Sequence, residues 1–262
     1  MSEFIQGIIT CWEAYGNSYL AGAGRTLLIS FVGTVIGCLI GFIVGIVQTI
    51  PTSKNDPLAK KVILKIVNAI LKVYVEVFRG TPMIVQAVFI YYGARMAFGI
   101  GMGMWAAAFF IVSINTGAYM AETVRGGILS IDSGQTEGAK AIGMTHFQTM
   151  LHVIFPQAFR NLIPQIGNNF IINIKDTSVL SIISITDLFF VHKSVVGALY
   201  LYFPSATIVM AIYLVMTLAA SFLLRKLEDN LDGDGSFDLA TTDTLAHTSG
   251  MAKFRVPTKR EV

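Results

Sequence analysis

The sequence predicts an all-α integral membrane protein with five transmembrane helices. Of its 262 residues, 54% are hydrophobic and only 13% are charged, and the mean hydropathy is +0.65. An ordinary soluble domain carries about 25% charged residues. This chain therefore has too few polar side chains to cover a water-soluble globule. A bilayer removes the difficulty, because side chains that face lipid are apolar.

Five stretches of the chain account for the predicted spans. Thr26–Ile50, Met96–Ala121 and Ser205–Leu224 contain no charged residue, and each reaches the roughly 20 residues that a helix needs to cross the hydrocarbon core. Gly80–Ala94 and Asn161–Ile174 are shorter and bounded by charges, so they span only if their helices extend past those charges. The predicted spans are 20–49, 72–98, 103–124, 157–182 and 203–226.

The distribution of basic residues predicts the orientation of these spans. The segments 51–61 and 123–160 and the C-terminus contain Lys and Arg, whereas 1–19 and 99–104 contain neither. The positive-inside rule therefore places the N-terminus outside and the C-terminus in the cytoplasm. We expect an extracytoplasmic segment 1–19, a transmembrane domain 20–226 and a cytoplasmic tail 227–262. The tail is rich in Asp, Gly, Ser and Thr and has no apolar period, which predicts a mobile extension.

The first predicted span contains a regular glycine pattern. Gly33, Gly37, Gly41 and Gly45 recur every four residues, which places them along one face of a helix. Another helix backbone can approach such a face closely. We favour a packing seam within the subunit, and a seam between two subunits stays open as the alternative.

Residues 58–79 have the pattern of an amphipathic helix with one polar stripe. The stripe consists of Lys61, Lys65, Asn68, Lys72, Glu76 and Arg79. Its first lysines are typical of an interfacial helix whose cations reach lipid headgroups. Glu76 and Arg79 come deeper, just before Gly80-Thr81-Pro82. These three residues are predicted to end or bend the helix.

The loop 134–156 between the third and fourth spans is predicted to be a short helix, a turn and a second helix that starts near Pro156. Ala139 and Gly143 are one turn apart and leave a smooth face for another protein. Glu137 lies near the helix N-terminus, where the dipole favours a negative charge. On the residues alone, a solvated connector fits equally well.

This loop resembles the signature loop of permease subunits of ABC importers. The signature is Glu-Ala-Ala, three residues, Gly, nine residues and Ile-x-Leu-Pro. The matching residues here are Glu137, Gly138, Ala139, Gly143, Val153, Phe155 and Pro156, and Gly138 in place of Ala is the main departure. In the family, the loop forms a coupling helix that docks in a cleft of the ATP-hydrolysing subunit. The resemblance therefore implies an ATPase-coupling role for Glu137, Gly138, Ala139, Gly143, Met144 and Thr145.

Three further stretches, 75–86, 115–128 and 156–180, resemble the polar amino acid uptake branch, which is the histidine/glutamine permease-like branch. The similarity covers residues 20–226. It implies the transmembrane domain of a type I ABC importer that forms a path for polar amino acids in the inner membrane of a prokaryote. The implied partners are a nucleotide-binding ATPase subunit, a second permease subunit in a homodimer or heterodimer, and an extracytoplasmic solute-binding protein.

Charged residues within spans are the candidates for the substrate path. A charge at a helix centre costs about 2.5–3.5 kcal/mol on insertion scales, so it usually faces a bundle interior or a partner. A binding site for a polar amino acid needs at least one acidic group, and one basic group or helix terminus, in a desolvated cavity. The charged candidates are Glu76, Arg79, Glu122, Lys175 and Asp176, and the uncharged polar residues Gln86 and Asn115 are added to them. The alternative is internal ion pairing that fixes the helix register. That alternative is favoured for Lys175 and Asp176 and is equally open for Glu76 and Arg79.

Motifs that the sequence lacks also limit its function. No Gly-x-x-x-x-Gly-Lys-Ser/Thr phosphate loop occurs, so we expect no ATP hydrolysis by this chain and assign ATP and Mg²⁺ to the partner ATPase. His146 and His152 have no third ligand nearby in the sequence, so we expect neither a metal site nor another cofactor. The net charge of +3 is interpreted as a topology signal rather than as a nucleic-acid patch.

Three other functions are alternatives to the predicted one. The closest is an ABC permease for another solute, such as methionine, an opine or a sulfur amino acid. A gradient-driven transporter or ion channel would need no ATPase and no docking loop. A structural membrane scaffold would leave the charges within the spans unexplained.

Overall fold

The structure is a computed structural model that describes residues 1–53, 56–99 and 101–232. In that part of the chain every regular element is helical, as the sequence predicts. The elements are α1 Ser2–Gln48, α2 Leu58–Gly80, α3 Met83–Val88, η1 Phe89–Gly93, α4 Ala94–Phe98, α5 Met104–Leu129, α6 Ser133–Ala141, α7 His146–Thr149, η2 Met150–Ile154, α8 Phe155–Asp176, η3 Thr177–Ile183, α9 Leu188–Leu199 and α10 Tyr202–Asp232. η1 and η2 are π-helical, and η3 is a 3₁₀ helix. From residue 233 onward, the predicted tail lies outside the described residues.

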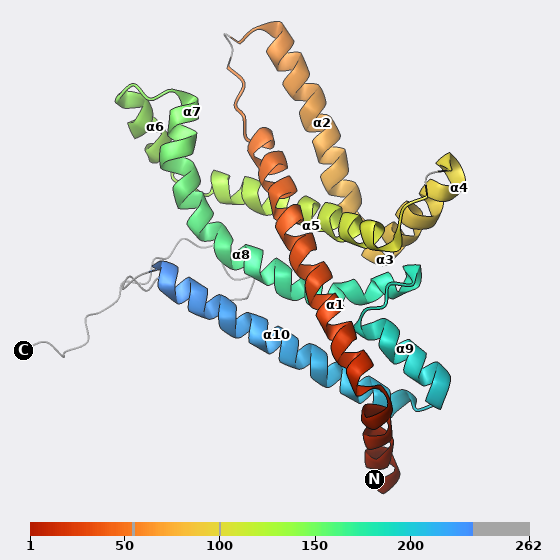
Figure 1. The fold of residues 1–262 in the computed structure, drawn as a ribbon. Coiled ribbons are helices and arrows are strands. Elements are labelled where there is room, and N and C mark those ends of the chain that lie inside the picture. Colours follow the sequence, from red (N-terminus) through yellow and green to blue (C-terminus); the bar gives the residue numbers. More distant parts are fainter. Residues whose placement is uncertain (54–55, 100, 233–262) are drawn as a thin grey trace, which may run out of the picture.

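α1 is the longest helix and connects the two ends of the molecule. It crosses α5 and packs against α8, α9 and α10, while α2 and the α6–α7 pair lie at the end opposite the N-terminus (Figure 1). Its 47 residues form one helix, and a rise of 1.5 Å per residue makes it about 70 Å long. Residues 2–19 are therefore helical and continuous with the predicted first span. Their extracytoplasmic location stays a prediction.

Three helices in the described part of the chain are long and apolar enough to cross a bilayer, namely α1, α5 and α10. A fourth span results if His146–Ile183 and Leu188–Leu199, which are bent by 51° at a short break, are counted together. Met83–Ala97 is apolar but shorter. The multi-pass helical architecture is thus confirmed, whereas the predicted count of five spans is not.

The predicted second span, 72–98, is wrong as a single helix. α2 begins at Leu58 and ends at Gly80, and α3 begins only at Met83. Pro82 disfavours the helical conformation for the residue before it, and Thr81 is extended, with φ −122° and ψ 145°. The expected helix end at Gly80-Thr81-Pro82 is confirmed.

The four glycines of α1 form a seam with α5, within the subunit. Gly37 is typical, since a Cβ atom added to it would lie 2.6 Å from the Cβ atom of Thr116. Gly33, Gly41 and Gly45 face Val112, Met120 and Val124 in the same way. Both helices contribute residues at a spacing of four, so each glycine receives one side chain of α5. The favoured interpretation of the glycine pattern is confirmed.

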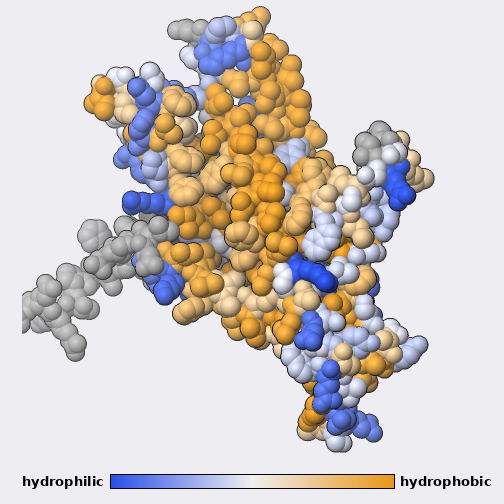
Figure 2. Space-filling model, viewed as in Figure 1, coloured by the Kyte–Doolittle hydropathy of each residue, from blue (hydrophilic) through white to orange (hydrophobic). Residues whose placement is uncertain are grey.

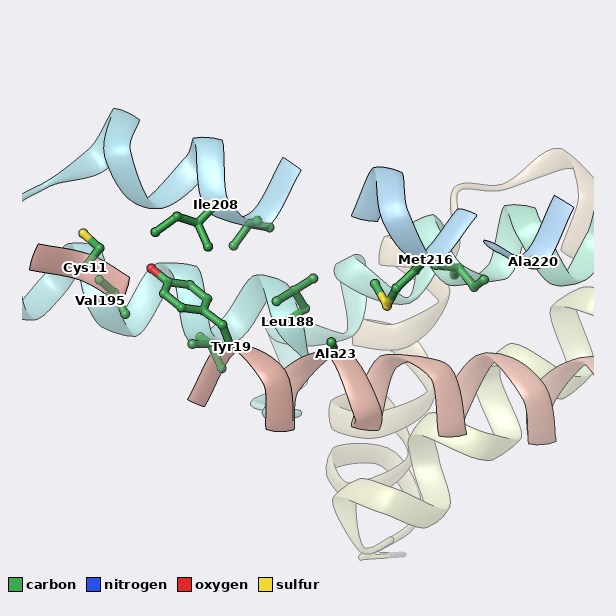
Figure 3. Packing of buried hydrophobic residues seen from close by; sticks show 11 residues of the cluster. Cys11, Tyr19, Ala23, Leu188, Val195, Ile208, Met216 and Ala220 are labelled. Carbon is green, nitrogen blue, oxygen red and sulfur yellow. The ribbon is translucent and has the colours of Figure 1, made fainter. Parts of the chain in front are cut away.

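Buried apolar side chains form several clusters around α1, and the apolar surface continues outside them. One cluster joins α1, α9 and α10 and includes Tyr19, Leu188, Ile208 and Met216 (Figure 3). On the face seen in Figure 2, apolar side chains cover the middle of the molecule, and hydrophilic ones gather at the α6–α7 end and at the N-terminal end of α1. An apolar belt between polar ends is the surface that a bilayer requires.

Candidate functional site

The turn after α6 has a geometry that only glycine adopts easily. Gly143 has φ +83°. Its N–H donates to the carbonyl of Lys140 at 3.0 Å, and the N–H of Met144 donates to the carbonyl of Ala139 at 3.1 Å. These two bonds define a Schellman motif, which satisfies carbonyls at the end of the helix. Gly143 therefore fixes where α6 stops and how the chain reverses.

The second helix of the loop starts ten residues before the predicted position. Thr145 and Gln148 form a capping box, in which the Gln148 N–H donates to Thr145 Oγ1 and the Thr145 N–H donates to Gln148 Oε1 at 2.8 Å. α7 therefore begins at His146 rather than near Pro156. The π-helical turn η2 then leads directly into α8, with Pro156 in the first turn of α8. Because the chain is already helical before Pro156, the missing N–H interrupts the hydrogen bonding of that turn, next to the π-helical turn η2.

The predicted coupling residues do not all lie on the surface. Glu137, Gly138, Gly143 and Thr145 are exposed, and Met144 is half-buried. Ala139 is only 6% exposed, so the expectation that it shares a smooth outer face with Gly143 is wrong. It is buried because α6 packs back against η2.

Sequence reasoning missed the two most exposed apolar side chains of the hairpin α6–α7. Ile142 is 79% exposed and Phe147 is 73% exposed, on either side of the Gly143 turn. Lys140 and His146 are exposed beside them. Their position beside a helix end, rather than on a periodic apolar face, was the signal that could have identified them. An apolar tip with a polar rim is the composition of a protein-docking surface.

Gln86 and Asn115 lie together at the break between α2 and α3. The Nε2 atom of Gln86 donates to the carbonyls of Phe78 and Thr81, at 2.9 Å in both cases. Nδ2 of Asn115 donates to Oε1 of Gln86 at 2.9 Å and to the Phe78 carbonyl at 3.2 Å. Both side chains are at least nine-tenths buried. The two amides therefore satisfy the end of α2 and attach it to α5.

Arg79, Glu122 and Arg125 form a second group, on α2 and α5. Arg125 donates to both carboxylate oxygens of Glu122. Nη1 of Arg79 lies 4.0 Å from Glu122 Oε2, and its guanidinium lies over the Tyr119 ring. Glu76 is exposed and makes no ion pair within the described residues. Of the two alternatives left open for Glu76 and Arg79, the local ion pair between them is not formed, and Arg79 lies near Glu122 instead.

Lys175 and Asp176 are the last two residues of α8, and both are exposed. Lys175 lines a cavity of about 420 Å³ together with Ser178, His192 and Tyr213. In the described part of the chain, no ion pair joins Lys175 to Asp176 or to another residue. The seven predicted path residues thus fall into three groups, with Glu76 beside the second.

A buried polar contact that the sequence did not indicate joins three helices. The Nδ2 atom of Asn173 in α8 donates to Thr34 Oγ1 in α1 at 2.8 Å and to Thr116 Oγ1 in α5 at 2.9 Å. These residues are far apart in the sequence and carry no charge. Because each hydroxyl accepts and the amide donates, the contact buries polar groups without leaving them unpaired.

Comparison with known proteins defines the class to which this fold and hairpin belong. Residues 58–233 match the family described as "Binding-protein-dependent transport system inner membrane component". The chain therefore belongs to this family of transport proteins.

Relatives and solved structures narrow the similarity within the family. The chain is 36% identical over 210 residues to the glutamine transport system permease protein GlnP of Escherichia coli (strain K12), covering 80% of this chain and 90% of that protein. It is 36% identical over 196 residues to the L-cystine transport system permease protein TcyB of Bacillus subtilis (strain 168), covering 72% and 81%. A crystal structure of an amino acid ABC transporter with histidines matches with a TM-score of 0.74 and 35% identity, covering 84% of this chain and 97% of that chain. The predicted amino acid type of ABC permease is confirmed.

Proposed function

We propose that this chain and a second permease subunit form the path by which a prokaryotic importer carries a polar amino acid across the cell membrane. A separate nucleotide-binding subunit hydrolyses ATP with Mg²⁺, and an extracytoplasmic binding protein delivers the substrate. The names of the relatives support the amino acid class, since they include transport systems for glutamine, arginine and L-cystine.

The observation that carries the proposal is the helical hairpin α6–α7. It exposes Ile142 and Phe147 at a tip whose shape is fixed by the Gly143 turn and the Thr145 capping box. A rigid tip with two apolar anchors suits a docking element that transmits motion from another subunit. A gradient-driven transporter has no use for such an element.

The proposal includes five spans in the predicted orientation, which requires that the shorter apolar helices also cross the bilayer. The proposed spans are α1, the segment from α3 to α4, α5, α8 with η3, and α10. This assignment places the α6–α7 hairpin and the basic segment 51–61 on the cytoplasmic side. It places α9 and the N-terminus outside.

The proposed path offers groups of both signs. Glu76, Arg79 and Glu122 supply them near the junction of α2 and α5, and Lys175 and Asp176 supply them at the end of α8. The ammonium and the carboxylate of an amino acid each find an opposite charge in such a set. Gln86 and Asn115 hold the helix break next to the first group.

The test uses the whole transporter, with its ATPase and binding protein, reconstituted in proteoliposomes. The variants Ile142→Ser and Phe147→Ser are expected to reduce both co-purification of the ATPase and substrate-stimulated ATP hydrolysis. Phe203→Ser is the matched control, because Phe203 is 74% exposed but lies at the start of α10, away from the hairpin. Amino acid uptake that continues without the ATPase subunit would favour the gradient-driven alternative and sink the proposal.

A further inference from the structure

The cavity beside Lys175 lies between the end of α8, η3, α9 and the first half of α10. Its volume of about 420 Å³ is within the roughly 300–1,000 Å³ of sites that bind small molecules. Phe189, Val209 and Met210 give it an apolar wall, and Lys175 and His192 place nitrogen atoms in the same cavity. Such a mixture of an apolar wall and a few polar groups is typical of a ligand site.

The cavity has a positive charge and no negative charge in its described lining. Lys175 makes no ion pair within the described residues. Asp176 follows Lys175 directly but is not part of the cavity wall, and Asp187 is fully buried and not part of it either. An ammonium group without a carboxylate partner favours an anionic ligand, to which it makes a charge-assisted hydrogen bond.

His192 offers the cavity a second polar atom, and a buried chain of hydroxyl groups holds its ring. Nδ1 of His192 lies 2.9 Å from Ser205 Oγ, which lies 2.6 Å from the hydroxyl of Tyr19. Tyr19 reaches from α1 into the buried cluster with α9 and α10 (Figure 3). Nε2 of His192 has no partner among the described residues and is not among the sealed unpaired atoms, so it is open to the cavity.

The hydroxyl chain also determines which ring nitrogen carries the proton. Tyr19 and Ser205 are fully buried, and in the described part of the chain their hydroxyls bond only to each other and to His192. If Nδ1 donated to Ser205, the proton of one of the two hydroxyls would be buried without an acceptor, which is unfavourable. Tyr19 therefore donates to Ser205, Ser205 donates to Nδ1, and the proton of the neutral imidazole is on Nε2. The cavity thus receives an N–H donor in a fixed direction.

We propose that this cavity binds the carboxylate of the transported amino acid, with Lys175 supplying the charge and the Nε2–H of His192 a directed hydrogen bond. The inference rests on the proposed function and deepens it, because it states which end of the substrate this part of the path recognises. Ser205 and Tyr19 are positioning residues, since they act on the ligand only through the ring of His192. A phosphate group is the other anion that such donors accept, and the test separates the two.

The test measures direct binding to the purified complex of permease and ATPase without the binding protein, so that the affinity of the binding protein does not enter. Saturation-transfer NMR gives the Kd values of the common L-amino acids and of L-cystine. The amino acid that binds most tightly is then compared with its α-carboxamide, which keeps the ammonium and the side chain but has no α-carboxylate. The unaltered complex is expected to bind the acid about tenfold more tightly than the amide, which corresponds to about 1.4 kcal/mol.

Lys175→Met and His192→Ala are each expected to weaken binding of the acid about tenfold and to leave binding of the amide unchanged. His192→Gln, whose side-chain amide can donate from near the position of Nε2, is expected to recover most of the affinity. Lys193→Met is the matched control, because Lys193 is an exposed cation on the same helix as His192 and does not line the cavity. Its two Kd values are expected to equal those of the unaltered complex.

Four outcomes would overturn the inference. They are no binding by any amino acid, a preference for the acid that survives in both Lys175→Met and His192→Ala, an equal loss of acid and amide binding in these variants, and tighter binding of inorganic phosphate than of the amino acid. The third outcome would show a purely structural role, and the fourth would assign the cavity to a phosphate group. The proposed function fails separately, if the complete transporter shows no ATP-driven uptake while the preference for the acid remains.

Discussion

Nδ2 of Asn115 donates a 2.9 Å hydrogen bond to Oε1 of Gln86, and this pair joins α5 to the break between α2 and α3. The break itself follows from Pro82, but its geometry depends on the two amides, which also bind the carbonyls of Phe78 and Thr81. Gln86 and Asn115, which the sequence suggests for the substrate path, thus use these amide groups to bond to other protein groups.

The first prediction concerns this pair. Asn115→Ala leaves Gln86 Oε1 without its donor, whereas the Phe78 carbonyl keeps the bond from Gln86 Nε2, so we expect a loss of about 1–3 kcal/mol in stability. Thermal unfolding of the purified complex measures the loss, and the apparent KM for substrate is expected to stay unchanged. Ser113→Ala is the control, since the buried Ser113 hydroxyl has no hydrogen-bond partner. A KM that rises while stability is unaffected would assign Asn115 to ligand binding instead.

The second prediction concerns the glycine seam. Gly37→Ala places a methyl group 2.6 Å from the Thr116 Cβ atom, which forces α1 away from α5. We expect a net loss of about 1–2 kcal/mol, because overpacking exceeds the gain of roughly 1 kcal/mol in helix propensity. Gly24→Ala on the same helix meets no atom within 4 Å and is expected to be neutral or stabilising. Equal melting temperatures for the two variants would contradict the seam.

The third prediction concerns the turn of the docking hairpin. Gly143→Ala puts a Cβ atom on a residue with φ +83°, at a cost of about 1–2 kcal/mol, so the end of α6 is expected to fray. Hydrogen exchange at the backbone amides of positions 143 and 144, compared between the variant and the unaltered protein, measures the fraying. Gly138→Ala, in the middle of α6 with open space around it, is expected to slow exchange there. Unchanged protection in the Gly143 variant would refute the role assigned to the turn.

The fourth prediction concerns Asp187, in the turn before α9 and outside the proposed spans. Its Oδ1 atom accepts the Phe190 N–H at 2.9 Å, but Oδ2 is buried without a partner. Burial raises the pKa of this carboxyl to about 6, above its ordinary 3.8, so the folded state holds the proton more tightly than the unfolded state. The stabilisation from this group is therefore complete below pH 3.8 and disappears as the pH rises through 6.

Asp187→Asn keeps the helix cap and removes the charge. Relative to the unaltered protein, its stability is expected to increase between pH 4 and pH 6 by at most about 3 kcal/mol and then to level off. Thermal unfolding across that range measures the difference. Asp187→Ala loses the cap and is expected to be less stable than the Asn variant at every pH. A difference between the Asn variant and the unaltered protein that does not vary with pH would contradict the buried charge.

The sequence predicts the elements of this fold better than the contacts between them. Glycines every four residues predicted a seam on α1, but the partner helix became visible only in the structure. Gly80-Thr81-Pro82 predicted the break after α2, because proline acts on its immediate neighbours. Pro156 predicts a helix start ten residues after the actual start of α7 at His146, which the Thr145–Gln148 capping box determines.

The polar contacts between helices could not be predicted from the sequence, and the reason is physical. Asn173 and Thr34 are 139 positions apart, and neither carries a charge or a motif. The one-turn spacing of Glu76 and Arg79 left a local ion pair and a ligand contact equally open, and Arg79 instead lies near Glu122 of the neighbouring helix. Local spacing indicates which residues share a helix face, but the partner across the interface depends on how the helices cross.

The glycine seam has a mechanical consequence. At each of the four glycines of α1, one side chain of α5 packs directly against the α1 backbone. This close packing prevents the two helices from sliding along each other. α1 and α5 therefore move together as one rigid body. Any opening or closing of the molecule must then take place at hinges outside this pair of helices. The candidates are the extended residues around Pro82 and the π-helical turn η2 before α8.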